Sequence, residues 1–373
     1  MKKIIIVLLL CFQFVSAQQE LALVRKEGKF GYLGKNGDFV IQPKYKVAKS
    51  FSNGLAAIEE NNKWGFINNK GETVIAPKFD KVKYFDSELC VVLKDKEWFY
   101  INKKGETVKS PTTDKVYDFD DGVAFIKKGD KIGLINSKME VVLDPKYDVI
   151  KSFEDGYARV KNNNHWGIID KSGKVVVEII YDEIGNYFKK TTWAKNGTSF
   201  GLVIAGKFKA IDGVDKIWDF YSESVTYAQK KGKIGFIDLN GNWVIEPKFD
   251  KAKAFVNGIA PVCIKNLWGY IDSVGKLIIE PRFNDAEIFS NDGLAPVKFV
   301  DIEWGFINKS GVLVIPTKYI ISAGGMFSIF KRDEKGFLDG IARVKSDSKW
   351  GFIKLDGTVL GNQLFENAEL FNN

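Results

Sequence analysis

A short phrase that joins a bulky apolar residue to glycine returns along the chain about every 34 residues, and this repetition limits the possible folds more than any other feature. A period of roughly 20 to 50 residues is typical of arrays in which each small unit buries its apolar face against its neighbours. We therefore predict one tandem array of ten units in place of several separate domains. The repeated phrase begins at Phe30, Trp64, Trp98, Ile132, Trp166, Phe200, Ile234, Trp268, Trp304 and Trp350.

Each unit opens with two strand-like stretches. The first is short and apolar with a small second residue, as in Leu55 to Ile58, and the small residue suggests close packing against a neighbouring unit. The second contains the repeated phrase. Its alternation places Trp64 and Phe66 on one face and Gly65 and Ile67 on the other. A glycine inside such a strand indicates that another backbone or ring approaches closely.

The rest of each unit reads as a hairpin turn, a third strand and a loop. The segment from Asn68 to Gly71 has turn residues, and Val74-Ile75 forms a third strand that we expect to end at Pro77. The return segment, Lys78 to Phe85, is expected to be a loop anchored by its aromatic residues. The fold class predicted is all-β, with ten units of three short antiparallel strands stacked as an open superhelix or solenoid. A propeller-like ring is the alternative, which we rank second because propeller blades typically have four strands and number about four to eight.

The first 17 residues read as a secretory signal peptide, and residues 18–373 form the array. A basic start at Lys2-Lys3 precedes an apolar run of about a dozen residues, shorter than the roughly 17 to 25 of a spanning helix. We expect cleavage after Ala17, export to the periplasm or outside the cell, and no membrane span afterwards. Leu10 argues against lipidation at Cys11, because lipoprotein processing requires a small residue there. The units begin near residues 21, 55, 89, 123, 157, 191, 225, 259, 294 and 341.

The formal net charge of +8 falls to +6 once Lys2 and Lys3 are removed with the signal peptide. An exported chain has little access to nucleic acid, so no nucleic-acid partner is expected. An acidic glycan or a charged protein face remains open as a partner. The other interpretation is that the lysines keep a strand-rich surface soluble.

Two stretches depart from the repeat. Between Lys189 and Ser224 the phrase weakens, and Trp193 and Trp218 occupy positions that are not tryptophan elsewhere. This stretch is either an altered unit or a binding surface. The second departure is an insertion at residues 320–338, which is either a surface loop or a contact site, since insertions in repeat proteins often lie on the binding face. Its candidate binding residues are Phe327, Phe330, Lys331, Arg332 and Phe337.

The phrase Lys63-Trp64-Gly65-Phe66-Ile67, followed by Gly71 and by Pro77-Lys78-Phe79-Asp80, resembles the bacterial WG (KWG) repeat family. The resemblance covers nearly all of residues 18–373. It implies β-rich repeats in secreted or envelope-associated proteins, with no established enzymatic activity and no catalytic residues to transfer. Trp98 keeps only the tryptophan, and five copies keep both residues: Trp64-Gly65, Trp166-Gly167, Trp268-Gly269, Trp304-Gly305 and Trp350-Gly351.

Residues that could support catalysis or bind a metal are sparse. The single histidine, His165, lies in a polar turn, and no serine or cysteine motif accompanies it. Cys90 and Cys263 are expected to be isolated thiols, which leaves no zinc or copper site. We therefore expect no catalytic residue, no metal and no cofactor. Aspartates that recur once per unit, at Asp80, Asp114, Asp148, Asp182 and Asp250, are expected to cap turns or pair with the lysine two positions earlier.

Two classes of function follow. The first is a non-catalytic scaffold of the bacterial envelope that binds another protein, because stacked repeats present a large surface. The alternative is a module that binds carbohydrate or cell-wall glycan through exposed aromatic rings. Isoleucine and phenylalanine replace tryptophan at Ile132, Phe200 and Ile234, so the tryptophans of the phrase are expected to serve mainly as structural bulk.

Overall fold

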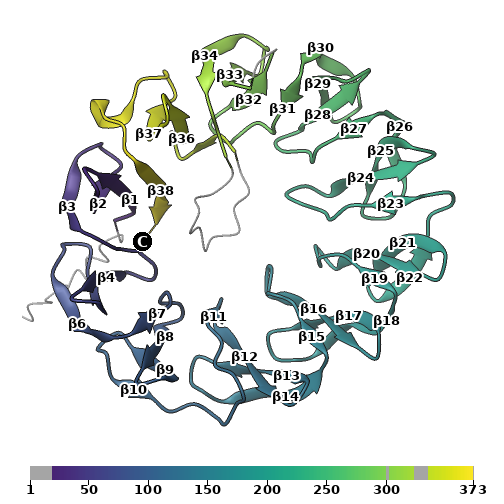
Figure 1. Cartoon of the computed structure of the whole chain (residues 1–373). Helices are drawn as coiled ribbons and strands as arrows, with labels where there is room; N and C mark the ends of the chain where they lie inside the picture. Colours follow the sequence, from purple (N-terminus) through teal and green to yellow (C-terminus); the bar gives the residue numbers. More distant parts are fainter. Residues whose placement is uncertain (1–18, 300–301, 323–334, 373) are drawn as a thin grey trace, which may run out of the picture.

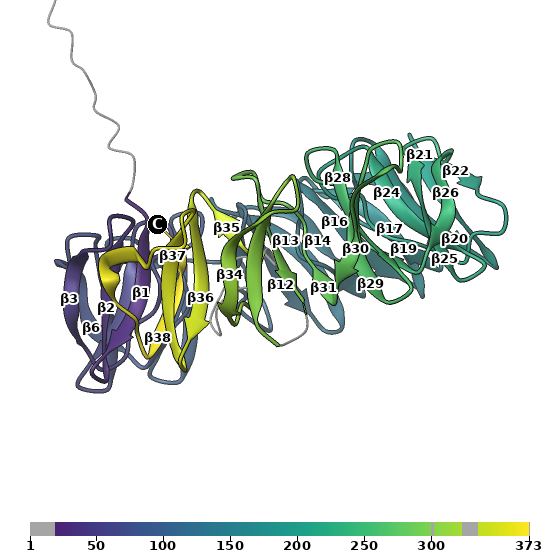
Figure 2. The same cartoon turned by 90° about the horizontal axis from the view of Figure 1, so that it is seen from above.

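The structure is a computed structural model that describes residues 19–299, 302–322 and 335–372. The described chain is built from short antiparallel strands, and its only helical turn is η1 (Leu360–Asn362). The strands form ten small sheets, the blades of a propeller-like ring (Figure 1). Seen from above, the blades lie side by side in one band that is a single blade deep (Figure 2). The all-β array of ten units is confirmed, and its arrangement is the ring that the sequence analysis ranked second.

The first five sheets follow the chain from its start. The strands of each sheet, from the first numbered to the last, are β1 (Leu21–Lys26), β2 (Lys29–Gly34), β3 (Phe39–Tyr45) and β38 (Asn367–Asn372); β4 (Ala56–Glu60), β5 (Lys63–Ile67) and β6 (Thr73–Phe79); β7 (Lys81–Val82), β8 (Leu89–Lys94), β9 (Glu97–Asn102) and β10 (Thr107–Val108); β11 (Phe119–Asp120), β12 (Val123–Lys128), β13 (Lys131–Asn136) and β14 (Val141–Tyr147); and β15 (Val149–Ile150), β16 (Tyr157–Asn162), β17 (His165–Asp170) and β18 (Val175–Tyr181).

The other five sheets complete the ring. Their strands are β19 (Glu183–Ile184), β20 (Thr191–Asn196), β21 (Ser199–Ile204) and β22 (Lys207–Ala210); β23 (Lys216–Ile217), β24 (Val225–Lys230), β25 (Lys233–Asp238) and β26 (Trp243–Phe249); β27 (Lys251–Ala252), β28 (Ile259–Ile264), β29 (Leu267–Asp272) and β30 (Leu277–Phe283); β31 (Asp285–Ala286), β32 (Leu294–Lys298), β33 (Trp304–Asn308) and β34 (Leu313–Tyr319); and β35 (Phe337–Leu338), β36 (Ile341–Ser346) and β37 (Lys349–Lys354).

The return segment forms the innermost strand of the following blade, where the sequence predicted only an anchored loop. β7 pairs antiparallel with β8, and the pairing is extended by two bonds in which the amides of Asp80 and Lys83 donate to the carbonyls of Leu93 (2.8 Å) and Val91 (2.9 Å). Most blades therefore have four strands, and each sequence unit spans two blades. The sequence missed this strand because two paired residues are too few to show an alternating pattern.

The pairing of a return segment with the next blade also closes the ring, which overturns the predicted open stack. The last return segment, β38, has no following blade and pairs with β1 of the first sheet, as Figure 1 shows. The seam is reinforced by Glu366, which accepts a bond from the amide of Gly28 at 3.0 Å and pairs with Arg25 at 3.4 Å. An open stack would leave the edges of both strands unpaired, and closure removes them.

The glycine of the repeated phrase is required by the third strand. β6 continues through Pro77, where the sequence predicted that it would end, and its register shifts so that Trp64 faces Phe79 and Phe66 faces Ile75. The bulge accommodates a proline that lacks an amide donor. A Cβ added to Gly65 would lie 2.5 Å from the Ile75 carbonyl oxygen and 2.7 Å from the Pro77 nitrogen. The predicted close approach at this glycine is confirmed.

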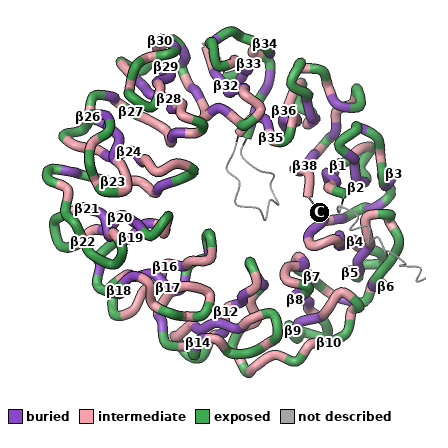
Figure 3. Tube along the Cα trace, turned by 180° about the vertical axis from the view of Figure 1, so that it is seen from behind, coloured by how far each residue is buried: buried purple, intermediate pink, exposed green. Residues whose placement is uncertain are grey.

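The hydrophobic core lies between neighbouring blades. Tyr32 and Phe51 of one interface meet edge to face at 4.7 Å, and the small Ala56 of the next blade packs in the same cluster with no exposed surface. Figure 3 shows buried residues concentrated in the middle strands and exposed ones at the outer turns. Because each interface is shared by two blades, no blade has a core of its own.

Candidate functional site

The tryptophans of the phrase are mostly capped by cations. Five of them have a lysine or arginine over the ring at 3.8–5.9 Å: Trp64, Trp166, Trp268, Trp304 and Trp350. Cation–π contacts of this kind stabilise partly exposed rings by about 0.5–1 kcal/mol each. All five rings are buried or half-buried. Their glycine partners Gly167, Gly269 and Gly305 lie against the third strand as Gly65 does, whereas at Gly351 the closest contact is the side chain of Leu364.

The recurring aspartates cap the next hairpin turn, as predicted. Asp80 Oδ2 accepts a bond from the amide of Asp95 at 3.1 Å, while its Oδ1 pairs with Lys63 at 2.5 Å. The predicted partner was the lysine two positions earlier, Lys78, which instead donates to the carbonyl of Gly105 at 3.4 Å. The hydrogen bond from Lys63 holds the pKa of the half-buried Asp80 carboxyl below its ordinary value. The lysine before Trp-Gly thus has a structural role in the repeat.

The two unusual tryptophans of the central stretch lie half-buried in the blades. The indole of Trp193 donates to Asp219 Oδ1 at 2.7 Å, and the space for this bond exists because residue 185 is glycine. The ring of Trp218 stacks on Tyr227 at 4.8 Å. These contacts favour the interpretation of an altered unit, and a binding role for the two rings stays a prediction.

Four of the five candidate residues of the insertion, Phe327, Phe330, Lys331 and Arg332, lie outside the described residues. The fifth, Phe337 in β35, is buried and packs edge to face on Phe306 at 5.0 Å. This is the same anchoring contact that Phe85 makes with Phe66 in an ordinary unit. Phe337 is therefore placed as a core residue.

The hairpins that join each innermost strand to the next strand, here called the inner hairpins, are linked from blade to blade. The Ser52 hydroxyl donates to the Phe85 carbonyl at 2.7 Å, and the amide of Gly258 donates to Glu223 at 2.8 Å. In Figure 1 these hairpins lie closest to the centre of the ring. Such bonds between successive blades hold the inner hairpins as one connected surface.

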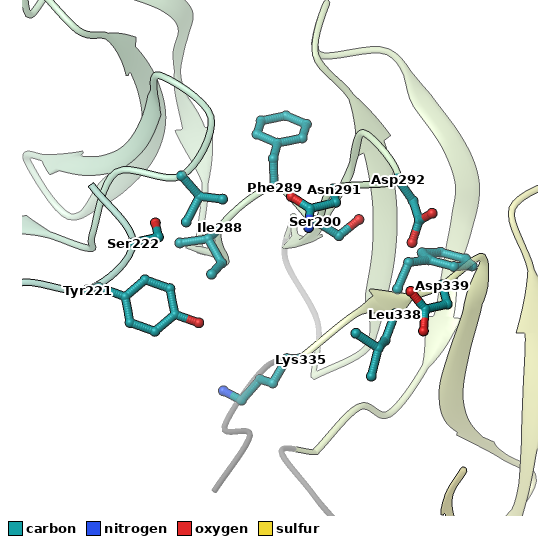
Figure 4. Close-up of a pocket in the computed structure, with 12 residues that line it drawn as sticks. Tyr221, Ser222, Ile288, Phe289, Ser290, Asn291, Asp292, Lys335, Leu338 and Asp339 are labelled. Atoms are coloured by element: carbon teal, nitrogen blue, oxygen red, sulfur yellow. The ribbon is translucent and has the colours of Figure 1, made fainter. Parts of the chain in front are cut away.

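A cavity of about 200 Å³ lies among the inner hairpins of four successive blades. Tyr221 stands on one side of it, Lys335 and Leu338 on another, and the backbone of Ser290 and Asn291 runs above them (Figure 4). The Ser290 hydroxyl is buried without a hydrogen-bond partner among the described residues. The serines at the same position of two other units, Ser52 and Ser222, donate to the carbonyls of Phe85 and Phe255 at 2.7 Å and 3.1 Å, a bond that the described part of the chain does not give Ser290.

Charged side chains stiffen the wall that contains Lys335. Glu287, with 13% of its side chain exposed, pairs with Lys335 at 2.8 Å and with Lys253 at 2.7 Å. Lys335 also lies over the ring of Trp304 at 5.5 Å. A carboxylate shared by two lysines holds both in one arrangement, so this wall of the cavity is preorganised.

A second and larger hollow lies beside Trp98, the most exposed of the six tryptophans in the phrase. Trp98 is 39% exposed, and no cation covers its ring in the described part of the chain. The hollow has a volume of about 660 Å³ and is lined by residues of β8, β9 and the segment 113–118. We call it the Trp98 groove. Small-molecule sites typically measure roughly 300 to 1,000 Å³.

The groove exists because phenylalanine replaces the glycine of the phrase at residue 99. A side chain at this position would collide with a third strand crossing as β6 does at Gly65. The third strand of this blade, β10, is accordingly only two residues long, and Trp98 lacks the strand partner that Phe79 gives Trp64. Phe99 turns instead towards Phe79 of the preceding blade, at 6.4 Å. Sequence reasoning missed this site, although Phe99 in place of glycine was its visible signal.

The model of the family described as "WG containing repeat" matches residues 30–64, 64–98, 98–131, 132–165, 166–197, 234–268, 268–299 and 304–319. These segments cover well over half of the chain. The chain is a WG-repeat protein. One stretch without a match, residues 198–233, contains most of the altered segment between Lys189 and Ser224. No curated protein matches this WG-repeat protein by sequence.

The similarity to solved structures comes at low sequence identity. A crystal structure described as the eukaryotic initiation factor has a TM-score of 0.51 and 9% identity, covering 95% of this chain and 98% of that chain. It shows a shared fold alone. BamB from Moraxella catarrhalis (TM-score 0.32, 12% identity, 92% of this chain and 90% of that one) and Hsv2 from Kluyveromyces lactis (0.32, 13%, 63% and 70%) superpose too loosely to support any argument.

The described part of this WG-repeat protein brings together no group of three or more His, Cys, Asp or Glu side chains able to hold a metal ion. His165 is exposed at the start of β17. Cys90 and Cys263 are separate buried thiols, and burial raises the pKa of the Cys90 thiol. Within the described residues no helix is long and apolar enough to cross a membrane.

Proposed function

We propose that this WG-repeat protein is an exported, non-catalytic scaffold of the bacterial envelope that holds a protein partner against the inner hairpins. The observation that carries the proposal is the cavity of about 200 Å³ bounded by inner hairpins of four successive blades. Its volume is below the roughly 300 Å³ at which small-molecule sites begin. It suits one side chain of a protein partner, since anchor residues fill pockets of this kind at the centre of an interface.

The surroundings of the cavity support a protein partner. Tyr221 at its edge is 49% exposed, and tyrosine is enriched among residues that dominate interface energies. Asp292 is held by the amide of Gly340 at 3.1 Å, and Lys335 is held by Glu287. A rigid rim loses little conformational entropy on binding, which raises affinity.

Export is part of the proposal and rests on the amino-terminal sequence. Residues 1–17 have the basic start, apolar run and small residues before Gln18 that signal peptidase recognises. Amino-terminal sequencing of the protein recovered from its source cell should give Gln18 as the first residue. A mature chain that still begins at Met1 would contradict export by this route.

Site-specific photocrosslinking tests the partner. A benzoylphenylalanine replaces Tyr221 in one variant and Val274 in the other, and both are irradiated in intact source cells. Val274 is the matched control because it is 76% exposed in the turn after β29, away from the inner hairpins. We expect one protein adduct specific to position 221, identified by mass spectrometry. Adducts that are the same at both positions, or absent at both, would overturn the proposal.

A further inference from the structure

The Trp98 groove has the features of a ligand site that the repeat does not need for its own stability. Each of the other five tryptophans in the phrase has a cation over its ring, and several pack in the cores between blades. Trp98 has no covering cation among the described residues, and no third-strand residue pairs with it, because the pairing of β10 reaches only Ile101 and Tyr100. In the preceding unit, Lys49 caps the ring of Trp64. Its counterpart here, Lys83, follows β7 and instead pairs with Asp118 at 3.7 Å. The indole face is therefore left open towards the groove.

The groove is lined by a second aromatic ring, that of Tyr117, on a fixed backbone. The Tyr117 carbonyl accepts a bond from the Tyr100 hydroxyl at 2.6 Å. The Tyr117 ring meets Phe125 edge to face at 5.8 Å and carries Lys115 at 4.7 Å. Tyr117 lines both this groove and a neighbouring hollow of about 220 Å³. The groove is thus lined by two aromatic rings, and Tyr117 is held by its contacts with Tyr100 and Phe125.

The polar groups around these rings include donors and acceptors of both signs. Lys83 and Lys115 supply ammonium donors, while Glu97, Asp114 and Asp118 supply carboxylate acceptors. An anionic ligand would meet three carboxylates, and an apolar ligand would cut the lysines and carboxylates off from solvent without offering them hydrogen bonds. A neutral ligand that has many hydroxyl groups and also a flat apolar face satisfies both the rings and the charges.

We propose that the Trp98 groove binds a neutral oligosaccharide, with one sugar ring stacked on the indole of Trp98 and its hydroxyl groups bonded to Lys83, Asp118 and Glu97. The groove of about 660 Å³ has room for more than a single side chain, unlike the cavity at the inner hairpins. The groove lies between the blades β7–β10 and β11–β14, on a different part of the ring from that cavity. Glycan binding and protein binding are thus separate properties of the ring.

Calorimetry with the mature chain, residues 18–373, tests the proposal against hexasaccharides of cellulose, chitin and maltose and against polygalacturonate as an anionic probe. We expect at least one neutral hexasaccharide to bind and to quench tryptophan fluorescence. Trp98→Ala should weaken that binding at least about tenfold, which corresponds to about 1.4 kcal/mol. Trp64→Ala, the same change one unit earlier at a capped ring, is the matched control and should leave the affinity unchanged.

A second variant separates the groove from the ring of Trp98 itself. Phe99→Gly restores the repeated phrase and should allow the third strand to cross as β6 does, closing the groove while Trp98 remains. This variant should also lose sugar binding, and circular dichroism should show that it stays folded although the contact of Phe99 with Phe79 is removed. The proposal is overturned if no neutral probe binds at millimolar concentration, if only polygalacturonate binds, or if both Trp98→Ala and Phe99→Gly bind as the unchanged chain does.

Discussion

Replacing Phe371 with alanine should weaken the seam at which the ring closes. Phe371 lies in β38, opposite Ala22 of β1, and its ring meets that of Phe352 at 4.8 Å. Truncating a fully buried phenylalanine to alanine costs about 3–5 kcal/mol. Because Phe371 is only half-buried, we expect about half of that cost. We expect the free energy of unfolding to fall by roughly 2 kcal/mol.

The matched control is Phe85→Ala, which removes the equivalent contact inside the continuous part of the chain. Phe85 meets Phe66 at 4.9 Å and is 1% exposed, so this change should cost about 3–5 kcal/mol. Urea unfolding followed by circular dichroism gives the free energies. Amide hydrogen exchange followed by mass spectrometry locates the effect: Phe371→Ala should speed exchange in β1 and β38, and Phe85→Ala in β5 and β8.

The seam argument fails if Phe371→Ala behaves as an ordinary surface substitution. Surface substitutions usually change the free energy of unfolding by no more than about 0.5 kcal/mol, so a change that small would contradict the argument. Unchanged exchange in β1 and β38 would lead to the same conclusion, because a strand that closes the ring must protect the amides with which it pairs. In either case the ends of the chain would not be joined as described.

Three further predictions concern the repeat itself. Gly65→Ala forces a Cβ against the backbone at Pro77 and should cost about 1–3 kcal/mol in urea unfolding, while a neutral result would mean that β6 shifts freely. Lys63 holds the pKa of Asp80 below its ordinary value of 3.8, so this pair stabilises the fold above about pH 4 and the stabilisation is lost as pH falls through the lowered pKa. Asp80→Asn should therefore flatten the fall in melting temperature between about pH 6 and about pH 2. An unchanged slope would mean that Asp80 does not contribute to this pH dependence. Trp193→Phe deletes the bond to Asp219 and should lower the free energy of unfolding by about 1–2 kcal/mol. An unaltered melting temperature in calorimetry would contradict this.

Local features of the unit could be predicted from the sequence because they depend on neighbouring residues. The alternation around Trp64 gave the second strand, and the turn residues before Gly71 gave the hairpin. The small size of Ala56 pointed to tight packing against the next blade, where it is buried. Most of these signals recur along the ten units, so that each copy supports the interpretation of the others.

Features that depend on how blades meet could not be read in the same way. Closure into a ring depends on the angle between successive sheets, summed over the whole array, and no residue pattern of one unit specifies that sum. The pairing of β38 with β1 follows only when that sum completes a circle. The cavity near Ser290 likewise requires four hairpins that lie far apart in sequence.

The Trp98 groove is an intermediate case. Phe99 was visible as a departure from the phrase, but its consequence follows only when the backbone that crosses the glycine is known. A side chain at residue 99 is incompatible with that crossing strand, so one substitution shortens β10 and exposes Trp98. A departure from a repeat is therefore most informative when the neighbour that the usual residue accommodates has been identified.

The offset between sequence unit and blade has a consequence for how such rings change in size. Each unit ends by giving its return segment to the next blade, as β7 follows β6, and β38 gives the final segment to β1. A gene duplication or loss of one whole unit would therefore leave every blade with its full set of strands, and the two ends of the chain would still meet. Rings with different numbers of blades could arise in single genetic steps, limited only by how far each interface can adjust its angle.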